Sequence, residues 1–150
     1  MFKKDNHGQL SLEYLLIIII ILLIFTFIVL PIGALAVDFA IDTSSIIESK
    51  NEVSKIATAI DNVYLNGKGS KRTLILDLPE NIVVDFSKSI NLVESKLSFS
   101  LNLSNGQRKQ IEIPLKYSKL QGSIELSKGY NKIIVHWVEE DDIIQIYKVS

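Results

Sequence analysis

The chain has 150 residues, and 16 Lys and Arg residues stand against 17 Asp and Glu residues, which gives a formal net charge of −1. This balance gives no reason to expect a nucleic-acid partner, because no basic stripe is interleaved with aromatic residues. The chain has no cysteine. Thiolate zinc sites and cysteine nucleophiles are therefore excluded, and a small domain must be stabilised by packing or by assembly with other chains.

An uncharged, mostly aliphatic run from Tyr14 to Val37 dominates the first third of the sequence. A helix needs about 20 apolar residues to cross a bilayer, and this run of roughly 24 residues could span about 36 Å. It predicts one membrane-spanning helix. About 80 residues remain after the helical region, which is enough for one small hydrophobic core.

The charges on the two sides of this run predict its orientation. Lys3 and Lys4 precede it, whereas Asp38, Asp42 and Glu48 follow it before the next lysine. Lysines before a span hold that end in the cytoplasm. The sequence therefore predicts an N-in, C-out topology with everything after Asp38 outside.

Three interpretations compete for the N-terminal segment. The first is a plain single-pass anchor. The second is a secretory signal peptide cut after Ala36, because Ala34-Leu35-Ala36 resembles such a cleavage site, although the apolar region exceeds the usual ~7–15 residues. The third starts from Glu13, a carboxylate at the edge of an apolar helix that would cost ~2.5–3.5 kcal/mol at the bilayer centre. Cleavage after Gly8 would give it a partner, a free amine on Gln9 on the same helix face.

The pattern Lys-Lys-x-x-x-Gly followed by Gln9-x-Ser11-x-Glu13-Tyr14 and a long aliphatic run resembles the class III signal sequence of archaeal type IV pilin-like proteins. The resemblance covers residues 1–30. It implies that a prepilin peptidase cuts between Gly8 and Gln9, after a leader whose charges are Lys3 and Lys4. Gln9, Ser11 and Glu13 would then serve assembly. The implied segments are a leader (1–8), a transmembrane and filament-core helix (9–37), an amphipathic continuation (38–67) and an extracellular β-rich head (68–150).

The resemblance also implies a function, partners and a location. The chain would be a major or minor pilin in an archaeal type IV pilus-like surface filament, serving adhesion or surface attachment. Its partners would be the lipid bilayer before assembly, the prepilin peptidase and other pilin subunits. It would reside in the cell membrane and in an extracellular filament. The alternatives are a membrane-anchored binding domain that is neither processed nor polymerised, and an anchored enzyme.

Pro31 and Gly33 predict a kink or local opening near the end of the apolar run, because proline removes a helical hydrogen bond and glycine weakens the same turn. A plain kink is one interpretation, and a hinge that lets subunits bend in a filament is the other. Ser45 and Glu48 resemble a capping box, yet we favour one continuous or nearly continuous helix.

After Asp38 the apolar residues follow helical spacing, which predicts an amphipathic helix that ends near Asn66-Gly67. The simplest interpretation is that this stripe packs on the following domain, and a face for neighbouring subunits is the alternative. The stripe consists of Ile46, Val53, Ile56, Ala57, Ile60, Val63 and Tyr64.

From Thr73 onward apolar residues recur at every second position, which is typical of half-buried strands. Asn105-Gly106 predicts a hairpin turn, and Pro114 indicates an edge position. The sequence therefore predicts an α+β fold, in which a long N-terminal helix carries a small antiparallel β domain, either a sandwich or a strongly twisted sheet. With the resemblance, this becomes a lollipop-like pilin architecture. The expected strands are Thr73–Leu78, Ile82–Phe86, Leu97–Leu103, Ile111–Tyr117, Ser123–Leu126, Tyr130–Val138 and Ile143–Val149.

Few residues have the spacing that catalysis or metal binding needs. His7 and His136 have no second ligand or base at a telling spacing, so a structural role for His136 is expected. The turn 139–142 is acidic but lacks the spaced oxygen ligands of a calcium loop. We expect no enzyme activity, no metal and no cofactor. Asn102-Leu103-Ser104 is an N-glycosylation triplet, and an extracellular chain could carry a glycan on Asn102.

Overall fold

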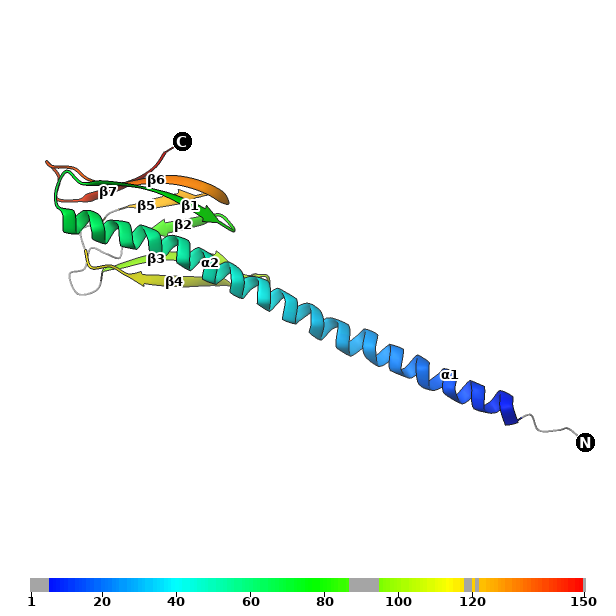
Figure 1. The fold of residues 1–150 in the computed structure, drawn as a ribbon. Helices are drawn as coiled ribbons and strands as arrows, with labels where there is room; N and C mark the ends of the chain where they lie inside the picture. Colours follow the sequence, from blue (N-terminus) through cyan, green and yellow to red (C-terminus); the bar gives the residue numbers. More distant parts are fainter. Residues whose placement is uncertain (1–5, 87–94, 118–119, 121, 150) are drawn as a thin grey trace, which may run out of the picture. The chain divides into compact units, whose positions relative to one another are not determined.

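A computed structural model describes residues 6–86, 95–117, 120 and 122–149, with the backbone alone for residues 6–11. The chain divides into two compact units, Met1–Ile41 and Asp42–Ser150. The predicted α+β class is confirmed, because a long N-terminal helix is followed by two small antiparallel sheets (Figure 1). Each unit is described by itself.

The helix is continuous from its first residue to its last. It comprises α1 (Asn6–Ile24), the π-helical turn η1 (Phe25–Val29) and α2 (Leu30–Asn66). The resemblance of Ser45 and Glu48 to a capping box does not mark a new helix, since α2 runs through both residues. As predicted, α2 ends before Gly67, whose φ of 84° is a left-handed conformation that glycine adopts without steric cost.

The amphipathic stripe of α2 packs on the sheets of its own chain, as predicted from its spacing. Val53, Ile56, Ile60 and Val63 are fully buried in the core, where the apolar side chains of both sheets meet them. Tyr64 differs from this expectation because it is 42% exposed.

Seven strands lie in the described residues, and they form two sheets. The three-stranded sheet has the order β1-β6-β7 and the four-stranded sheet has the order β4-β3-β2-β5, with all pairs antiparallel. The sequence left open either a sandwich or one strongly twisted sheet, and the structure has two sheets. The strands are β1 (Lys71–Leu78), β2 (Ile82–Asp85), β3 (Lys96–Asn102), β4 (Arg108–Pro114), β5 (Ser123–Leu126), β6 (Gly129–Trp137) and β7 (Ile144–Val149).

The β3–β4 hairpin and its edge position are confirmed. Gly106 has a φ of 78°, and its N–H donates to the carbonyl of Leu103 at 2.9 Å. The side chain of Asn105 accepts the N–H of Gln107 at 2.9 Å, which holds the turn. Strand β4 lies at the edge of its sheet and ends at Pro114, where a missing N–H costs no ladder hydrogen bond.

Helix α2 lies along the edge strands of the two sheets, β1 and β4 (Figure 1). Glu52 accepts the backbone N–H of Asp77 in β1 at 3.2 Å, and Asp61 accepts the N–H of Lys116 just beyond β4 at 3.1 Å. These charge-assisted bonds satisfy N–H groups that no neighbouring strand pairs. On the other side, Lys148 of β7 donates to Ser127 after β5 at 2.9 Å.

One buried polar residue of α2 has a specific energetic consequence. Ser49 is 0% exposed, and its hydroxyl has no hydrogen-bond partner among the residues that the structure describes. We expect Ser49→Ala to raise the free energy of unfolding by about 1–2 kcal/mol, because it removes an unpaired buried hydroxyl and improves helix propensity. Urea unfolding of the full chain in detergent, followed by the fluorescence of Trp137, measures this.

Ser54 provides the matched control on the same helix. Its hydroxyl donates to the carbonyl of Lys50 at 2.7 Å, so Ser54→Ala removes a satisfied group and should change stability little. A loss of stability in Ser49→Ala would contradict the prediction.

Candidate assembly helix

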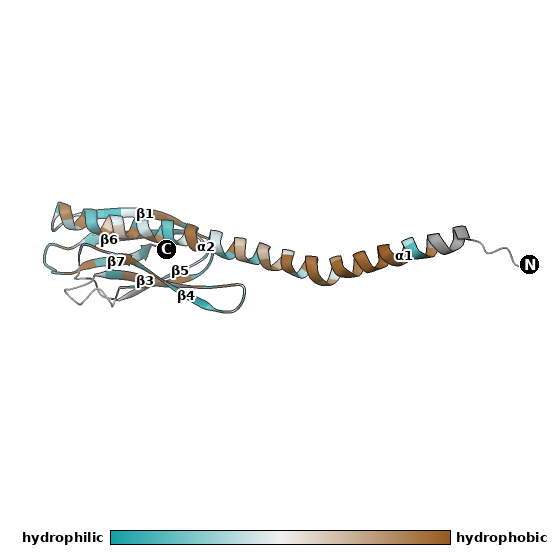
Figure 2. Cartoon of the chain, turned by 90° about the horizontal axis from the view of Figure 1, so that it is seen from below, coloured by the Kyte–Doolittle hydropathy of each residue, from teal (hydrophilic) through white to brown (hydrophobic). Residues whose placement is uncertain are grey.

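The first unit is an apolar helix whose described side chains are exposed. Every residue from Leu12 to Ile41 is exposed, including the large side chains Phe27 and Leu35. The described helix Leu12–Asn66 contains a stretch with a mean hydropathy of 3.5, long and apolar enough by length and composition to cross a membrane. Figure 2 shows this hydrophobic run from α1 into the first turns of α2. An apolar surface of this extent requires lipid or other protein to cover it.

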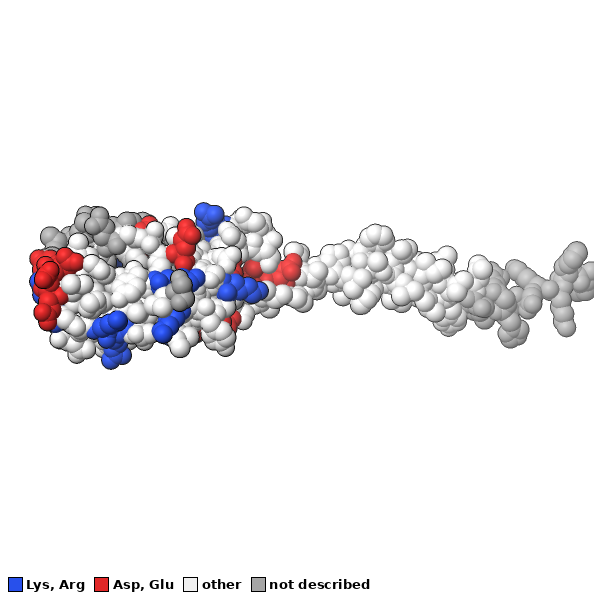
Figure 3. Space-filling model, turned by 90° about the horizontal axis from the view of Figure 1, so that it is seen from above, with Lys and Arg blue, Asp and Glu red and all other residues white. Residues whose placement is uncertain are grey.

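Charged residues gather on the second unit. Figure 3 shows them on the sheet-bearing part of the chain, whereas uncharged side chains cover the helix on the face drawn. Within Leu12–Val37 the single charged residue is Glu13. A lone carboxylate beside a long apolar run is costly in lipid unless a cation reaches it.

The predicted processing and assembly residues all lie in one helix. Helix α1 begins at Asn6, so it includes Gly8, Gln9, Ser11 and Glu13. The spacing of four residues places Gln9 and Glu13 on one helix face, about 6 Å apart along the axis. The bond between Gly8 and Gln9 lies in the first helical turn, where the N–H groups have no intrahelical partner and the helix opens most easily.

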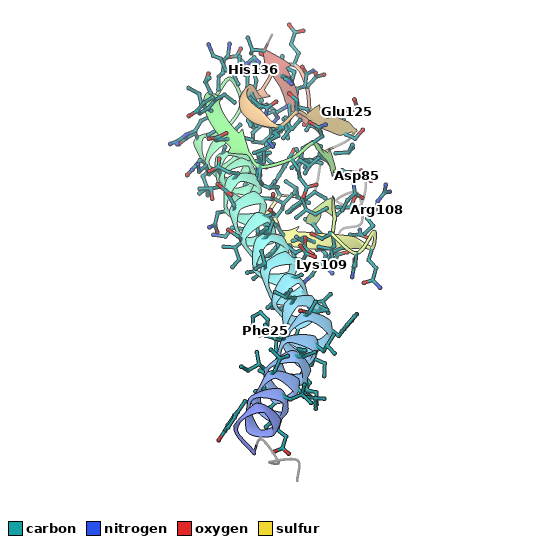
Figure 4. All side chains as sticks on the ribbon, turned by 90° about the vertical axis from the view of Figure 1, so that its right-hand side faces the viewer. Phe25, Asp85, Arg108, Lys109, Glu125 and His136 are labelled. Carbon is teal, nitrogen blue, oxygen red and sulfur yellow. The ribbon has the colours of Figure 1, made fainter. Side chains whose placement is uncertain are left out.

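The predicted irregularity before Pro31 takes the form of a π turn. The N–H of Leu30 donates to the carbonyl of Phe25, five residues back, and Phe25 opens this turn (Figure 4). Pro31 has no N–H to donate to the carbonyl of Phe27, and in a regular helix its ring would clash with that carbonyl. One wider turn removes the clash and accommodates the missing hydrogen bond. An added Cβ at Gly33 would meet no atom within 4 Å.

A carboxylate on α2 forms hydrogen bonds with the β3–β4 hairpin. Asp42, the first residue of the second unit, accepts the hydroxyl of Ser104 at 2.7 Å and the N–H of Ser104 at 3.0 Å. Nearby, burial raises the pKa of Glu80, the N–H of Asn102 opposes this shift, and the charge of Asp42 adds to it. The contact between Asp42 and Ser104 was not predictable from the sequence, because the two residues are 62 positions apart and no local pattern connects them.

Three aromatic rings pack together where α2 ends. Tyr64 stacks on Trp137 with ring centroids 5.7 Å apart, and Tyr117 lies 4.6 Å from Tyr64. The hydroxyl of Tyr117 donates to the carbonyl of Asp142 at 2.7 Å. Burial raises the pKa of Tyr117, with smaller contributions from Asp142 and Tyr64. This cluster explains why the partly exposed Tyr64 still belongs to the stripe.

The residues considered for catalysis are not brought together. His136 lies in β6, apart from Asp85 and Glu125 of the other sheet (Figure 4). In the described ranges, no group of three or more His, Asp or Glu residues is placed to hold a metal ion. The turn 139–142 is exposed. Asp142 forms an ion pair with Lys68 at 3.1 Å, and the N–H of Trp137's indole donates to the carbonyl of Asp141.

The fold and the exposed helix define a class of protein, one with a long apolar N-terminal helix and a small two-sheet β domain. The helix is a candidate membrane span. Comparisons with family models, with curated proteins and with solved structures find no match to this chain.

Proposed function

We propose that this chain is a pilin-like subunit of a surface filament. The observation that carries the proposal is an apolar helical run, exposed from Leu12 to Val37, in which Glu13 is the one charged residue. Lipid would cover this helix in the precursor, and the helices of other subunits would cover it in the filament. The resemblance of about the first 30 residues to a class III signal sequence supports the same conclusion.

The proposed mechanism begins with insertion in an N-in, C-out orientation. A membrane peptidase removes Met1 to Gly8 and leaves a free amine on Gln9. Transfer of the helix from lipid into a bundle gains little from the hydrophobic effect itself, because lipid is also apolar, so dense packing of Leu15 to Leu30 must supply the driving force. Glu13 pairs with a Gln9 amine, its own or a neighbour's, and this pairing sets the axial register because a misplaced charge in the core is costly.

The turn before Pro31 has a role in this proposal. A π turn and a proline interrupt the helical ladder at one place, and such interruptions let helices bend. The segment from Phe25 to Gly33 would then be the hinge through which each subunit adjusts to its neighbours.

The N-terminal residue of the mature protein tests the proposal. The protein is isolated from its native membrane or cell surface, and its N-terminal peptide is identified by mass spectrometry. A start at Gln9 supports pilin-type processing. An intact Met1 would overturn it in favour of an anchored binding domain, and a start at Val37 would overturn it in favour of a secreted domain.

Processing should also depend on Gly8. We expect Gly8→Val to block cleavage and to leave a precursor that is heavier by the residues 1–8, because a branched side chain would occupy the space beside the scissile bond. Immunoblotting of membranes shows the two forms. Gly33→Ala is the control, since a methyl group fits there without contact. Complete cleavage of Gly8→Val would contradict the prediction.

A further inference from the structure

We propose that Asn102 carries an N-linked glycan, and that the glycan is attached before the β3–β4 hairpin docks on α2. The inference rests on the proposed outward location of the second unit, because glycan transfer takes place on the non-cytoplasmic side of a membrane. It adds a modification site that the filament proposal does not require.

The acceptor side chain is accessible in the folded domain. Asn102 is the last residue of β3 and is exposed, whereas the preceding Leu101 is buried in the core. Its Oδ1 accepts a hydrogen bond from Nε of Arg108 at 3.4 Å. The amide nitrogen Nδ2, which would bear the sugar, makes no hydrogen bond within the described part of the chain. Asn102 pairs with Arg108 in the β3–β4 ladder, and Figure 4 labels Arg108 and Lys109 at the start of β4.

A glycan at this site is compatible with the fold. In β3 the side chains of Leu97, Phe99 and Leu101 face the core, and Asn102 alternates to the other face of the sheet. A sugar on Nδ2 would therefore project into solvent and displace no core side chain. N-linked glycans are bulky and belong on such surfaces.

The transfer step balances without an oxidant or reductant. The co-reactant is an oligosaccharide linked to a lipid through phosphate. A bond forms between Nδ2 of Asn102 and the anomeric carbon of the first sugar, and the bond from that carbon to the phosphate oxygen breaks. The amide proton passes to a base of the transferase, and the lipid phosphate leaves.

The third residue of the triplet determines when this step can occur. An N-glycosyl transferase recognises the hydroxyl two residues after the asparagine, which here belongs to Ser104. In the folded domain that hydroxyl donates to Oδ1 of Asp42 at 2.7 Å, and the backbone N–H of Ser104 bonds to both carboxylate oxygens. Presenting this hydroxyl to the transferase requires breaking its bonds to Asp42, so transfer is faster before the hairpin contacts α2.

The first experiment is a mass measurement on the full chain isolated from its native cell surface. The tryptic peptide Leu97–Arg108 contains Asn102 and Asn105, and we expect it to carry added hexose-type mass. Asn102→Gln should remove that mass. Asn105→Gln, in the same turn but outside the triplet, and Ser104→Thr, which keeps the hydroxyl, should retain it. A peptide with the mass of the bare polypeptide, or a glycan that survives Asn102→Gln, would overturn the assignment.

Protease treatment of intact cells separates this proposal from the proposed function. Removal of the second unit by an external protease with an unmodified Asn102 would overturn the glycan and leave the outward topology standing. Protection of the second unit with an unmodified Asn102 would overturn both.

A second experiment tests the order of events. Full chains lacking the glycan are purified in detergent after synthesis in a host without the transferase, and are then incubated with membranes that contain the transferase and its lipid donor. We expect folded wild-type protein to be modified at least tenfold more slowly than Asp42→Ala, in which Ser104 is released. Glu48→Ala, which removes an exposed carboxylate elsewhere on α2, should behave as wild type. Equal rates for wild type and Asp42→Ala would overturn the proposed order.

Discussion

Glu13→Ala should leave the precursor in the membrane and abolish most of its assembly. The substitution makes the apolar helix easier to insert, because it removes its one charge. In the filament core it leaves the Gln9 amine without a partner, and an uncompensated buried charge costs about 3–5 kcal/mol. Because each 1.4 kcal/mol is a factor of ten, the yield of filaments should fall by about a hundredfold or more. Electron microscopy of sheared cell-surface material, with immunoblots of the membrane fraction, measures both pools.

Two variants control this experiment. Glu48→Ala removes an exposed carboxylate from α2 in the second unit and should leave filament yield unchanged. Glu13→Asp retains the charge on a shorter side chain and should restore part of the yield. A Glu13→Ala strain that makes filaments at the wild-type level would exclude Glu13 from the setting of register.

Ile60→Ala should cause a large loss of stability in the second unit. Ile60 is fully buried between α2 and the sheets, and truncation of such a side chain costs about 2–5 kcal/mol through lost burial and the cavity it leaves. Urea unfolding of the full chain in detergent reports this loss through Trp137, the single tryptophan, which packs against Tyr64 of the same helix.

Leu65 provides the comparison for this substitution. It lies five residues further along α2 and is 73% exposed, so Leu65→Ala should change the free energy of unfolding by less than about 0.5 kcal/mol. Equal losses for the two variants would show that the stripe does not pack on the sheets in solution.

Much of the fold was predictable because its signals are local. The period of the apolar residues changes from helical spacing before Asn66 to alternation after Thr73, and both periods are confirmed by the buried faces of α2, β1 and β3. The turn at Asn105-Gly106 and the edge position of Pro114 follow from backbone restrictions of glycine and proline. The interruption before Pro31 was predictable for the same reason, although its form as a π turn was not.

The contacts between elements were not predictable from the sequence. The division of the strands into two sheets depends on pairings such as β1 with β6, whose residues are far apart in the chain. Asn131 is another example, since its buried amide holds Ser127 and Gly129 at the β5–β6 turn. The sequence places Asn131 in a strand but gives no signal that its side chain is buried, and only the fold shows that it is buried and fully hydrogen bonded.

The positions of the assembly residues were predictable from the sequence, but their contacts with a partner were not. The sequence places Gln9 and Glu13 on one helix face and Gly8 at the candidate cleavage site, and the structure keeps all three in α1. The partner that would cover the apolar helix is another chain or a membrane. The roles of these residues therefore remain predictions that the experiments above decide.

The sequence by itself determined which segments are helix and strand, which faces are apolar, and that one helix is apolar enough to cross a membrane. These properties depend on residues within a few positions of each other, through helical and strand periodicity and the backbone preferences of glycine and proline. The tertiary structure alone decided the order of strands in two sheets, the use of Asp42, Glu52 and Asp61 to bind backbone N–H groups, and the burial of Ser49. Those features depend on contacts between segments that are far apart in the sequence. Such contacts form only when the whole core packs, so no local pattern predicts them.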